Sequence, residues 1–284
     1  MTTDVAIEVE ELRKDYGDHN AVCGISFSVR RGEVFGLLGP NGAGKTTTVE
    51  ILEGYRRRTA GRVAVLGMDP GPRPVALRER IGVVLQSSGL YRHLTVREAV
   101  SHWAGFYRSP RDVEETIGLS GLQAAADQRT RTLSGGQQRR LDFALALVGD
   151  PELVFLDEPT TGFDPAARRQ AWDTVRSLQE LGKTVLLTTH YLDEAQALAD
   201  RVAIIKEGRI LAQGDPGSLR PGGQRYRVSY RNGDGGLVER ETDDPTVLLH
   251  ELTATAIARG ERLEQLTVSR PTLEEVYLEL TTDG

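Results

Sequence analysis

The sequence predicts an α/β fold with a parallel sheet, and three observations support this class. Residues 34–38 form a wholly apolar run, typical of a strand buried on both faces, and lead directly into a glycine-rich loop. From residue 153 to residue 205, strand-like apolar runs alternate with a helical segment, as in parallel sheets. Residues 87–150 instead show helical patterns. We therefore expect a parallel sheet that is interrupted by a helical subdomain.

The remaining elements follow in chain order. Residues 5–38 have strand patterns, and the loose alternation before the buried run predicts an antiparallel β subdomain at the N-terminus. The other expected elements are helices over 46–53, 95–107, 112–117, 137–148 and 166–181, and strands over 153–156, 185–188, 202–205 and 210–212.

A Pro-Gly-Gly turn at 221–223 marks a domain boundary, because the pattern of strands and helices starts afresh beyond it. We therefore predict a main domain over 1–220, with its helical subdomain at about 87–150, and a small α+β accessory domain over 221–284. Thr272 and Glu275 form a capping-box pattern that begins a last helix. Its apolar stripe is expected to dock on the main domain or on a second copy; the stripe consists of Leu273, Val276, Tyr277 and Leu280.

Composition excludes several classes of protein. The chain of 284 residues carries a net charge of −6 without a basic stripe, so we expect no nucleic-acid partner. The single cysteine, Cys23, excludes a disulfide framework and suits a reducing compartment. Acidic residues near the N-terminus argue against an export signal, and no stretch approaches the ~20 apolar residues of a membrane span. We expect a soluble, cytoplasmic chain whose membrane part, if any, is a separate protein.

The glycine-rich loop after the buried strand, Gly39-Pro40-Asn41-Gly42-Ala43-Gly44-Lys45-Thr46, has the full pattern of a phosphate-binding loop. Its glycines permit tight turns and let backbone N–H groups approach phosphates, and the following helix adds the positive end of its dipole. Lys45 would pair with the outer phosphates, and the Thr46 hydroxyl would ligate Mg²⁺. The alternative, a chance glycine-rich turn, does not explain the complete pattern.

Two adjacent acids, Asp157 and Glu158, end the apolar run 153–156. Carboxylates at the end of a buried strand are costly unless they face a cation or a water-filled site. Asp157 fits an outer-shell Mg²⁺ ligand, and Glu158 fits a general base that polarises an attacking water. A solvated strand end is the alternative.

A third motif, Leu133-Ser134-Gly135-Gly136-Gln137, lies between the first two. Ser134 offers a hydroxyl, the two glycines expose backbone N–H groups, and a helix begins just after them. These features predict a second anion-binding helix N-terminus.

In this order, the three motifs resemble the ATP-binding cassette (ABC) family over about residues 5–218. The resemblance implies a P-loop NTPase fold of the ABC nucleotide-binding type, ATPase activity, and ATP and Mg²⁺ as cofactors. It further implies a head-to-tail dimer, in which Ser134, Gly135, Gly136 and Gln137 contact the γ-phosphate on the partner's loop and Asp164 lies at the same interface. Phe163 stands where leucine is commoner, which is an apolar exchange.

The resemblance also assigns residues that no motif isolates. Gln86, after an apolar strand, would contact Mg²⁺ and the attacking water; His190 would contact the γ-phosphate; and Tyr16 would stack on adenine. The alternatives are a structural histidine and an ordinary core or surface tyrosine. The implied catalytic residues are Lys45, Gln86, Glu158 and His190, the implied metal ligands are Thr46, Gln86 and Asp157, and Thr47 joins the phosphate loop.

Two short segments, residues 138–142 and 270–278, resemble the daunorubicin-resistance type of ABC export ATPase, which works with a separate membrane permease. The expected function is therefore to power export of a drug, lipid or polysaccharide from the cytoplasmic face of the membrane. We expect the permease to dock on residues 87–107, which carry several large apolar side chains. An ABC importer ATPase, a soluble ABC ATPase and an unrelated P-loop kinase are the alternatives, the last disfavoured by the Leu133–Gln137 motif.

Overall fold

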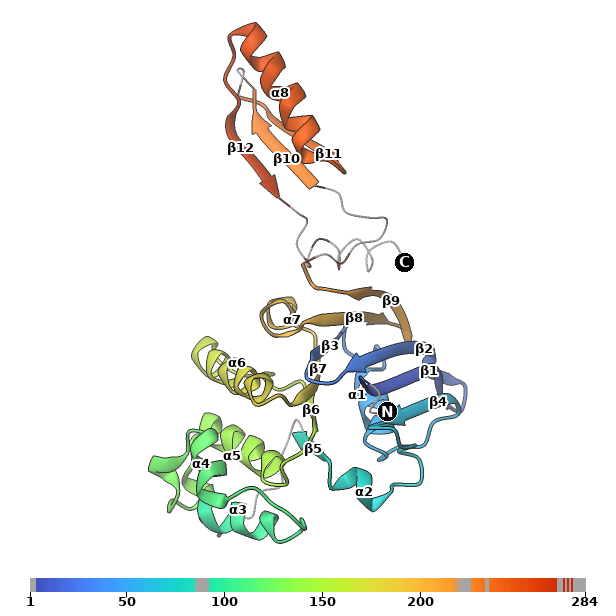
Figure 1. Cartoon of the computed structure of the whole chain (residues 1–284), viewed down its shortest axis with the longest axis vertical. Coiled ribbons are helices and arrows are strands. Elements are labelled where there is room, and N and C mark those ends of the chain that lie inside the picture. The colour runs from blue at the N-terminus through green and yellow to red at the C-terminus, as the bar shows by residue number, and fades with distance from the viewer. Residues whose placement is uncertain are drawn as a thin grey trace. The chain divides into compact units, whose positions relative to one another are not determined.

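The computed structural model describes residues 4–84, 92–217, 219, 226–232, 235–269, 273, 275 and 277. The chain forms two compact units, Met1–Gln213 and Gly214–Gly284 (Figure 1). These units divide at Gly214, whereas the sequence analysis placed a domain boundary after residue 220. Among the described residues, none of the helices combines the length and the apolar character that crossing a bilayer requires.

The N-terminal part of the first unit is an antiparallel sheet of three strands in the order β2-β1-β4. These strands are β1 (Val5–Tyr16), β2 (His19–Arg30) and β4 (Ala60–Val65). Alternate apolar side chains of β1 and β2 are buried in a core that also takes residues of α1 (Lys45–Leu52). Phe27 of β2 stacks on Phe35 of the main sheet at 5.4 Å between ring centroids, so the two sheets share this core.

The main sheet has the strand order β5-β6-β7-β3-β8-β9, and its first five strands pair in parallel. The strands are β5 (Ile81–Val84), β6 (Leu153–Asp157), β7 (Thr184–Thr189), β3 (Val34–Leu38), β8 (Arg201–Lys206) and β9 (Arg209–Gly214). Every residue of β3 and β7 is buried, as in a sheet covered on both faces. The α/β class predicted from the sequence is therefore confirmed.

Both faces of this sheet carry a core. Leu153 and Phe155 of β6 pack with α1 and the antiparallel sheet, whereas Val154 and Leu156 pack with helices on the opposite face. Those helices are α5 (Gly135–Leu147), α6 (Pro165–Glu180) and α7 (Leu192–Leu198). The order β6-β7-β3 places the carboxyl ends of these three strands side by side, and ligands bind at such edges in open α/β sheets.

The helical subdomain has its own core, in which α3 (Val96–Ala104), α4 (Val113–Leu119) and α5 meet. Two short 3₁₀ turns, η1 (Gln123–Ala125) and η2 (Thr130–Thr132), connect α4 to α5, and α2 (Val75–Arg78) precedes β5. The predicted helix 95–107 is shorter, because Thr95 caps its start and the helix ends before Gly105. The predicted helix 137–148 begins earlier, at Gly135, because Ser134 is its N-cap.

The second unit is a small antiparallel sheet in the order β11-β10-β12 with one long helix. Its elements are β10 (Tyr226–Arg231), β11 (Leu237–Thr242), α8 (Pro245–Arg259) and β12 (Glu264–Ser269). Asp244 caps α8, and Gly260 ends it in the left-handed conformation. In the predicted last helix, Leu273 is buried; Thr272, Val276 and Leu280 lie outside the described residues.

Candidate nucleotide site

The phosphate loop follows β3 and can be built only with glycine at particular positions. Gly44 has φ 101°, and a Cβ there would lie 2.5 Å from the carbonyl oxygen of Ala21. At Gly39 a Cβ would lie 2.2 Å from the carbonyl oxygen of Ile205. Helix α1 begins at Lys45 with no side-chain cap on its N-terminus. Backbone N–H groups of this terminus are therefore available to an anion.

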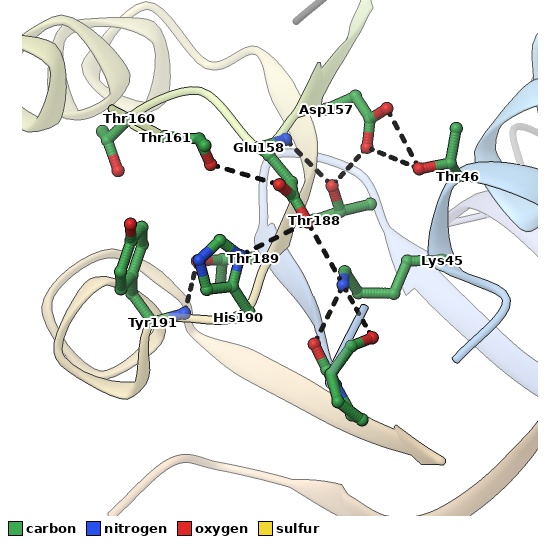
Figure 2. Close-up of polar contacts among 12 residues, drawn as sticks. Lys45, Thr46, Asp157, Glu158, Thr160, Thr161, Thr188, Thr189, His190 and Tyr191 are labelled. Atoms are coloured by element: carbon green, nitrogen blue, oxygen red, sulfur yellow. Dashed lines mark hydrogen bonds and ion pairs between the residues drawn. The ribbon is translucent and has the colours of Figure 1, made fainter. Parts of the chain in front are cut away.

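Lys45 is held inside the loop with only 4% of its surface exposed. Its Nζ donates to the carbonyl oxygens of Gly39 at 2.9 Å and Pro40 at 3.1 Å, and lies 3.2 Å from Glu158 Oε1. A buried ammonium needs such partners, because its desolvation is otherwise costly. The loop thus fixes a positive charge beside the catalytic acid predicted from the sequence (Figure 2).

Asp157, at the end of β6, lies opposite Thr46, the first residue after Lys45. The Thr46 hydroxyl is 3.3 Å and 3.5 Å from the two carboxylate oxygens, and Thr188 Oγ1 donates to Asp157 Oδ1 at 2.5 Å. A hydroxyl and a carboxylate that converge in this way fit Mg²⁺, which takes one or two protein ligands together with phosphates and water. The described residues hold no group of three or more His, Cys, Asp or Glu side chains that could cage a metal alone. The third predicted ligand, Gln86, lies outside the described residues.

Glu158 occupies a strained backbone conformation, with φ 45°. A residue other than glycine in this region persists only where its surroundings hold it, and such residues cluster at functional sites. Its amide donates to Thr188 Oγ1 at 3.0 Å. Its carboxylate accepts from Thr161 Oγ1 at 3.1 Å and lies 3.3 Å from His190 Nδ1.

The charge state of Glu158 follows from these neighbours. Burial alone raises the pKa of its carboxyl, but the attraction and hydrogen bonds of Lys45 and His190 outweigh burial and leave the pKa below its usual value. The group is therefore a carboxylate at neutral pH, which is the form that can accept a proton.

His190 follows β7 and reaches Glu158 from the adjacent strand end, as Figure 2 shows. Thr188 and Thr161 contact the acids but were not predicted from the sequence. The signal available for Thr188 was the change from apolar to polar residues at the end of an otherwise apolar strand.

A cavity of ≈ 410 Å³ lies over the phosphate loop. Tyr16 is at its rim with 39% of its surface exposed, and the cations of Lys14 and Arg56 lie 4.8 Å and 5.3 Å from its ring centroid. Gly39, Pro40 and Ala43 shape the loop without lining this cavity, and His19 lines it without having been predicted. The lining residues are Tyr16, His19, Ala21, Asn41, Gly42, Gly44, Lys45, Thr46, Thr47, Asp157 and Glu158.

The third motif lies at a second cavity, of ≈ 500 Å³, which shares no lining residue with the first. Ser134 caps α5 in a closed capping box with Gln137, and a Cβ at Gly135 or Gly136 would meet no atom within 4 Å. Asp164 Oδ1 accepts from the amide of Ala167 at 2.9 Å in the first turn of α6. Gln137 is engaged in the capping box and does not line the cavity, which is formed by Ser134, Gly135, Gly136, Arg140, Gly162, Phe163, Asp164, Ala167 and Gln170.

A phosphate loop with a buried lysine after β3, a histidine after the neighbouring strand β7 and two acids at the end of β6, the next strand along, define a nucleotide-hydrolysing P-loop protein. Residues 22–161 match the family model described as ABC transporter. The chain belongs to this family, and it is an ATP-binding ATPase.

Two relatives support this assignment over most of the chain. The chain is 39% identical to the daunorubicin resistance ATP-binding protein DrrA3 of Streptomyces coeruleorubidus, over 99% of this chain and 97% of that protein. It is 44% identical to the Nod factor export ATP-binding protein I of Burkholderia orbicola (strain AU 1054), over 88% of this chain and 81% of that protein.

Solved structures agree on the fold. CbiO1 of Clostridium perfringens, part of an ABC transporter complex, has a TM-score of 0.67 and 33% identity over 75% of this chain and 89% of that one. The dimeric ATP-binding cassette MJ0796 bound to ADP and Pi has a TM-score of 0.66 and 25% identity over 74% of this chain and 98% of that one.

Proposed function

We propose that this chain is the ATP-hydrolysing subunit of an ABC exporter and works as a head-to-tail dimer. The observation that carries the dimer is the division of the site. One cavity has the phosphate loop, the other has the Ser134–Gln137 helix terminus, and they share no lining residue. Two copies arranged head to tail would bring the loop of one against the helix terminus of the other, so that each ATP is bound between them.

Within one chain, different residues would contact different parts of the nucleotide. Tyr16 stacks on the adenine, and backbone N–H groups of residues 39–46 cradle the phosphates. Lys45, now paired with Glu158 at 3.2 Å, gains the outer phosphates as a stronger anionic partner. Thr46 and Asp157, joined by Gln86, would hold Mg²⁺, which would offset negative charge on the phosphates.

For hydrolysis, Glu158 accepts a proton from the attacking water, because its lowered pKa keeps it ionised at neutral pH. His190, 3.3 Å from the same carboxylate, orients it and contacts the γ-phosphate. From the partner copy, Ser134, Gly135, Gly136 and Gln137 add backbone and side-chain donors at that phosphate, and Asp164 lies at the same interface.

The direction of transport rests on the relatives, whose names describe a drug-resistance protein and an export ATP-binding protein. The permease would be a separate membrane protein that holds this chain at the cytoplasmic face. The substrate would be a drug, lipid or polysaccharide that need not touch the ATPase.

The docking surface we propose for the permease includes α3 and the turn after it. There His102, Trp103 and Phe106 form a ring cluster with centroids 5.3–6.1 Å apart, and Phe106 is 66% exposed. An exposed aromatic group of this kind fits a protein partner. Of the other large apolar residues in the predicted docking segment, Leu94 is partly buried against the core of the helical subdomain, and Leu90 and Tyr91 lie outside the described part of the chain.

Glu158→Gln tests the dimer and the general base together. Without the base, ATP persists, so we expect turnover to fall by roughly 100-fold or more while ATP binding stays intact. Size-exclusion chromatography with Mg-ATP should show a dimer for this variant and a monomer for Glu158→Gln combined with Lys45→Ala. A Glu158→Gln chain that stays monomeric at saturating ATP would contradict the shared-site model.

A further inference from the structure

The short loop after Glu158 is anchored by two buried charged side chains from different helices. Pro159 and Thr160 follow Glu158 directly and lead toward Asp164. Arg139 of α5 reaches the first of them, and Glu194 of α7 reaches the second. Neither charged residue belongs to the cavities described above.

Arg139 lies in the first half of α5, the helix that Ser134 caps, and only 7% of its surface is exposed. Its Nε donates to the carbonyl oxygen of Pro159 at 3.2 Å, and its NH1 lies 3.8 Å from Asp142. Burial lowers the pKa of the guanidinium, and the negative charges of Asp142, Asp157 and Glu194 oppose that shift. Helix α5, whose N-terminus lines the second cavity, is thereby tied to the loop that follows Glu158.

Glu194 is fully buried in the first turn of α7, shortly after His190. Its Oε1 accepts from Thr160 Oγ1 at 2.8 Å and from Trp172 Nε1 at 3.2 Å. Burial raises the pKa of this carboxyl, and hydrogen bonds from Thr189, Thr160 and Trp172 oppose the rise. One buried carboxyl group therefore joins β7, α6 and the loop after Glu158.

Buried charges of this kind are an expensive way to stabilise a fold, since apolar residues of similar volume often do as well or better. They do, however, fix backbone positions through directed hydrogen bonds. Glu158, with φ 45°, needs such support, because a residue other than glycine is strained in this conformation. On its N-terminal side, the amide of Glu158 donates to Thr188. On its C-terminal side, Arg139 and Glu194 hold the next two residues.

We infer that Arg139 and Glu194 are positioning residues for hydrolysis, which clamp Pro159 and Thr160 so that the Glu158 carboxylate is held at the attacking water. This inference rests on the general-base role proposed for Glu158. Both residues act through the loop that follows Glu158 and line neither of the two cavities.

Thr160→Val tests the clamp, because it keeps the shape of a side chain that is 1% exposed and removes only the hydroxyl that donates to Glu194. We expect kcat to fall roughly 10- to 100-fold, as for a displaced catalytic group, with KM for ATP changed by no more than about twofold. Thr160→Ser, which keeps the hydroxyl, should restore most of the rate. Thr116→Val is the matched control: its buried hydroxyl donates to Asp112 in the helical subdomain, and its loss should affect Tm but not kcat.

The outcomes distinguish a failure of the proposed general base from a failure of the clamp. An active Glu158→Gln enzyme would refute the general base itself. With Glu158→Gln inactive, a wild-type kcat for Thr160→Val would refute the clamp. The clamp would also be refuted if Thr160→Val lowered kcat, changed KM and lowered Tm together, and Thr160→Ser did not restore them. If Thr160→Val does not fold, Glu194→Gln is measured in the same assay, where a lower kcat at unchanged KM supports the clamp and a wild-type kcat refutes it.

Discussion

Helices α1 and α5 both begin at a proposed anion site, yet their N-termini are built in opposite ways. Helix α1 starts after Gly44, without a side-chain cap, and carries the buried Lys45 in its first turn. Helix α5 starts after Ser134 in a capping box closed by Gln137. The first terminus therefore has no side chain paired with its amides, whereas in the second the amides of Ser134 and Gln137 are already paired by the capping box.

The glycines at the two helix termini also differ in the reason why glycine is needed there. At Gly44 the chain itself forbids a side chain, because the carbonyl oxygen of Ala21 would lie 2.5 Å from it. At Gly135 and Gly136 the space is open. Glycine in the phosphate loop is thus needed to fold the loop, whereas in the second motif glycine keeps room for something outside the chain, which we propose to be the partner's nucleotide.

Gly136→Ala should have the largest effect and the most selective one. Because a Cβ there meets no atom of its own chain, the variant should fold and bind ATP normally. It should still lose hydrolysis by roughly 100-fold, because the donors at the partner's γ-phosphate are pushed back. Steady-state ATPase rates and titration calorimetry measure the two parts, with Gly118→Ala in α4 as the control. Equal rates for the two variants would remove the distinction between the termini.

Lys45→Ala should act at the other terminus and on binding itself. It removes the ammonium that would pair with the outer phosphates, so ATP affinity should fall roughly 10- to 100-fold, the loss typical of one or two charge-assisted contacts. Titration calorimetry with Mg-ATP measures the change, and thermal unfolding checks that the chain remains folded. Unchanged affinity would show that the loop backbone alone holds the phosphates.

Gly44→Ala should affect stability before it affects function. A side chain at φ 101°, against the Ala21 carbonyl, should lower the free energy of unfolding by about 1–3 kcal/mol. Urea unfolding compares this variant with Gly136→Ala, which should be near wild type. If both variants unfold alike, the distinction between a glycine that folds the loop and one that admits a partner is wrong.

Ser134→Ala should have a smaller effect on stability than Gly44→Ala, about 1 kcal/mol for a lost N-cap. Thr95→Ala is a matched control, since Thr95 closes the same type of capping box on α3, away from both cavities. Both variants should lose similar stability in urea unfolding, but only Ser134→Ala should also slow ATP hydrolysis. A Thr95→Ala variant that slows hydrolysis equally would show that capping alone explains the effect.

The sequence predicted the parts of the site that are continuous in the chain. The phosphate loop, the strand end at Asp157 and Glu158, and the Ser134–Gln137 motif each have spacings that only a few local structures satisfy. The ends of the elements were predicted less closely. The helix expected from residue 137 begins at Gly135, because the Ser134 hydroxyl accepts a hydrogen bond from the amide of Gln137 and caps the helix.

The sequence could not show which residues distant in the chain come into contact in the fold. Thr188 became a partner of both acids because β7 lies between β6 and β3. Arg139 lies in the segment 138–142 that resembles the export ATPases, but no role was predicted for Arg139, Thr160 or Glu194. The contacts that suggest their roles appear only where α5, α7 and the loop after β6 come together.

By itself, then, the sequence determined the fold class and the family and predicted the residues of a nucleotide site, because backbone turns, buried strands and glycine spacing are local properties. Only the tertiary structure decided how those residues support one another. The carboxyl ends of parallel strands meet at one edge of a sheet whatever their separation in the chain, and the order β6-β7-β3 decides which of them become neighbours. The strained backbone at Glu158 also depends on the tertiary structure, because the contacts that surround it come from segments distant in sequence.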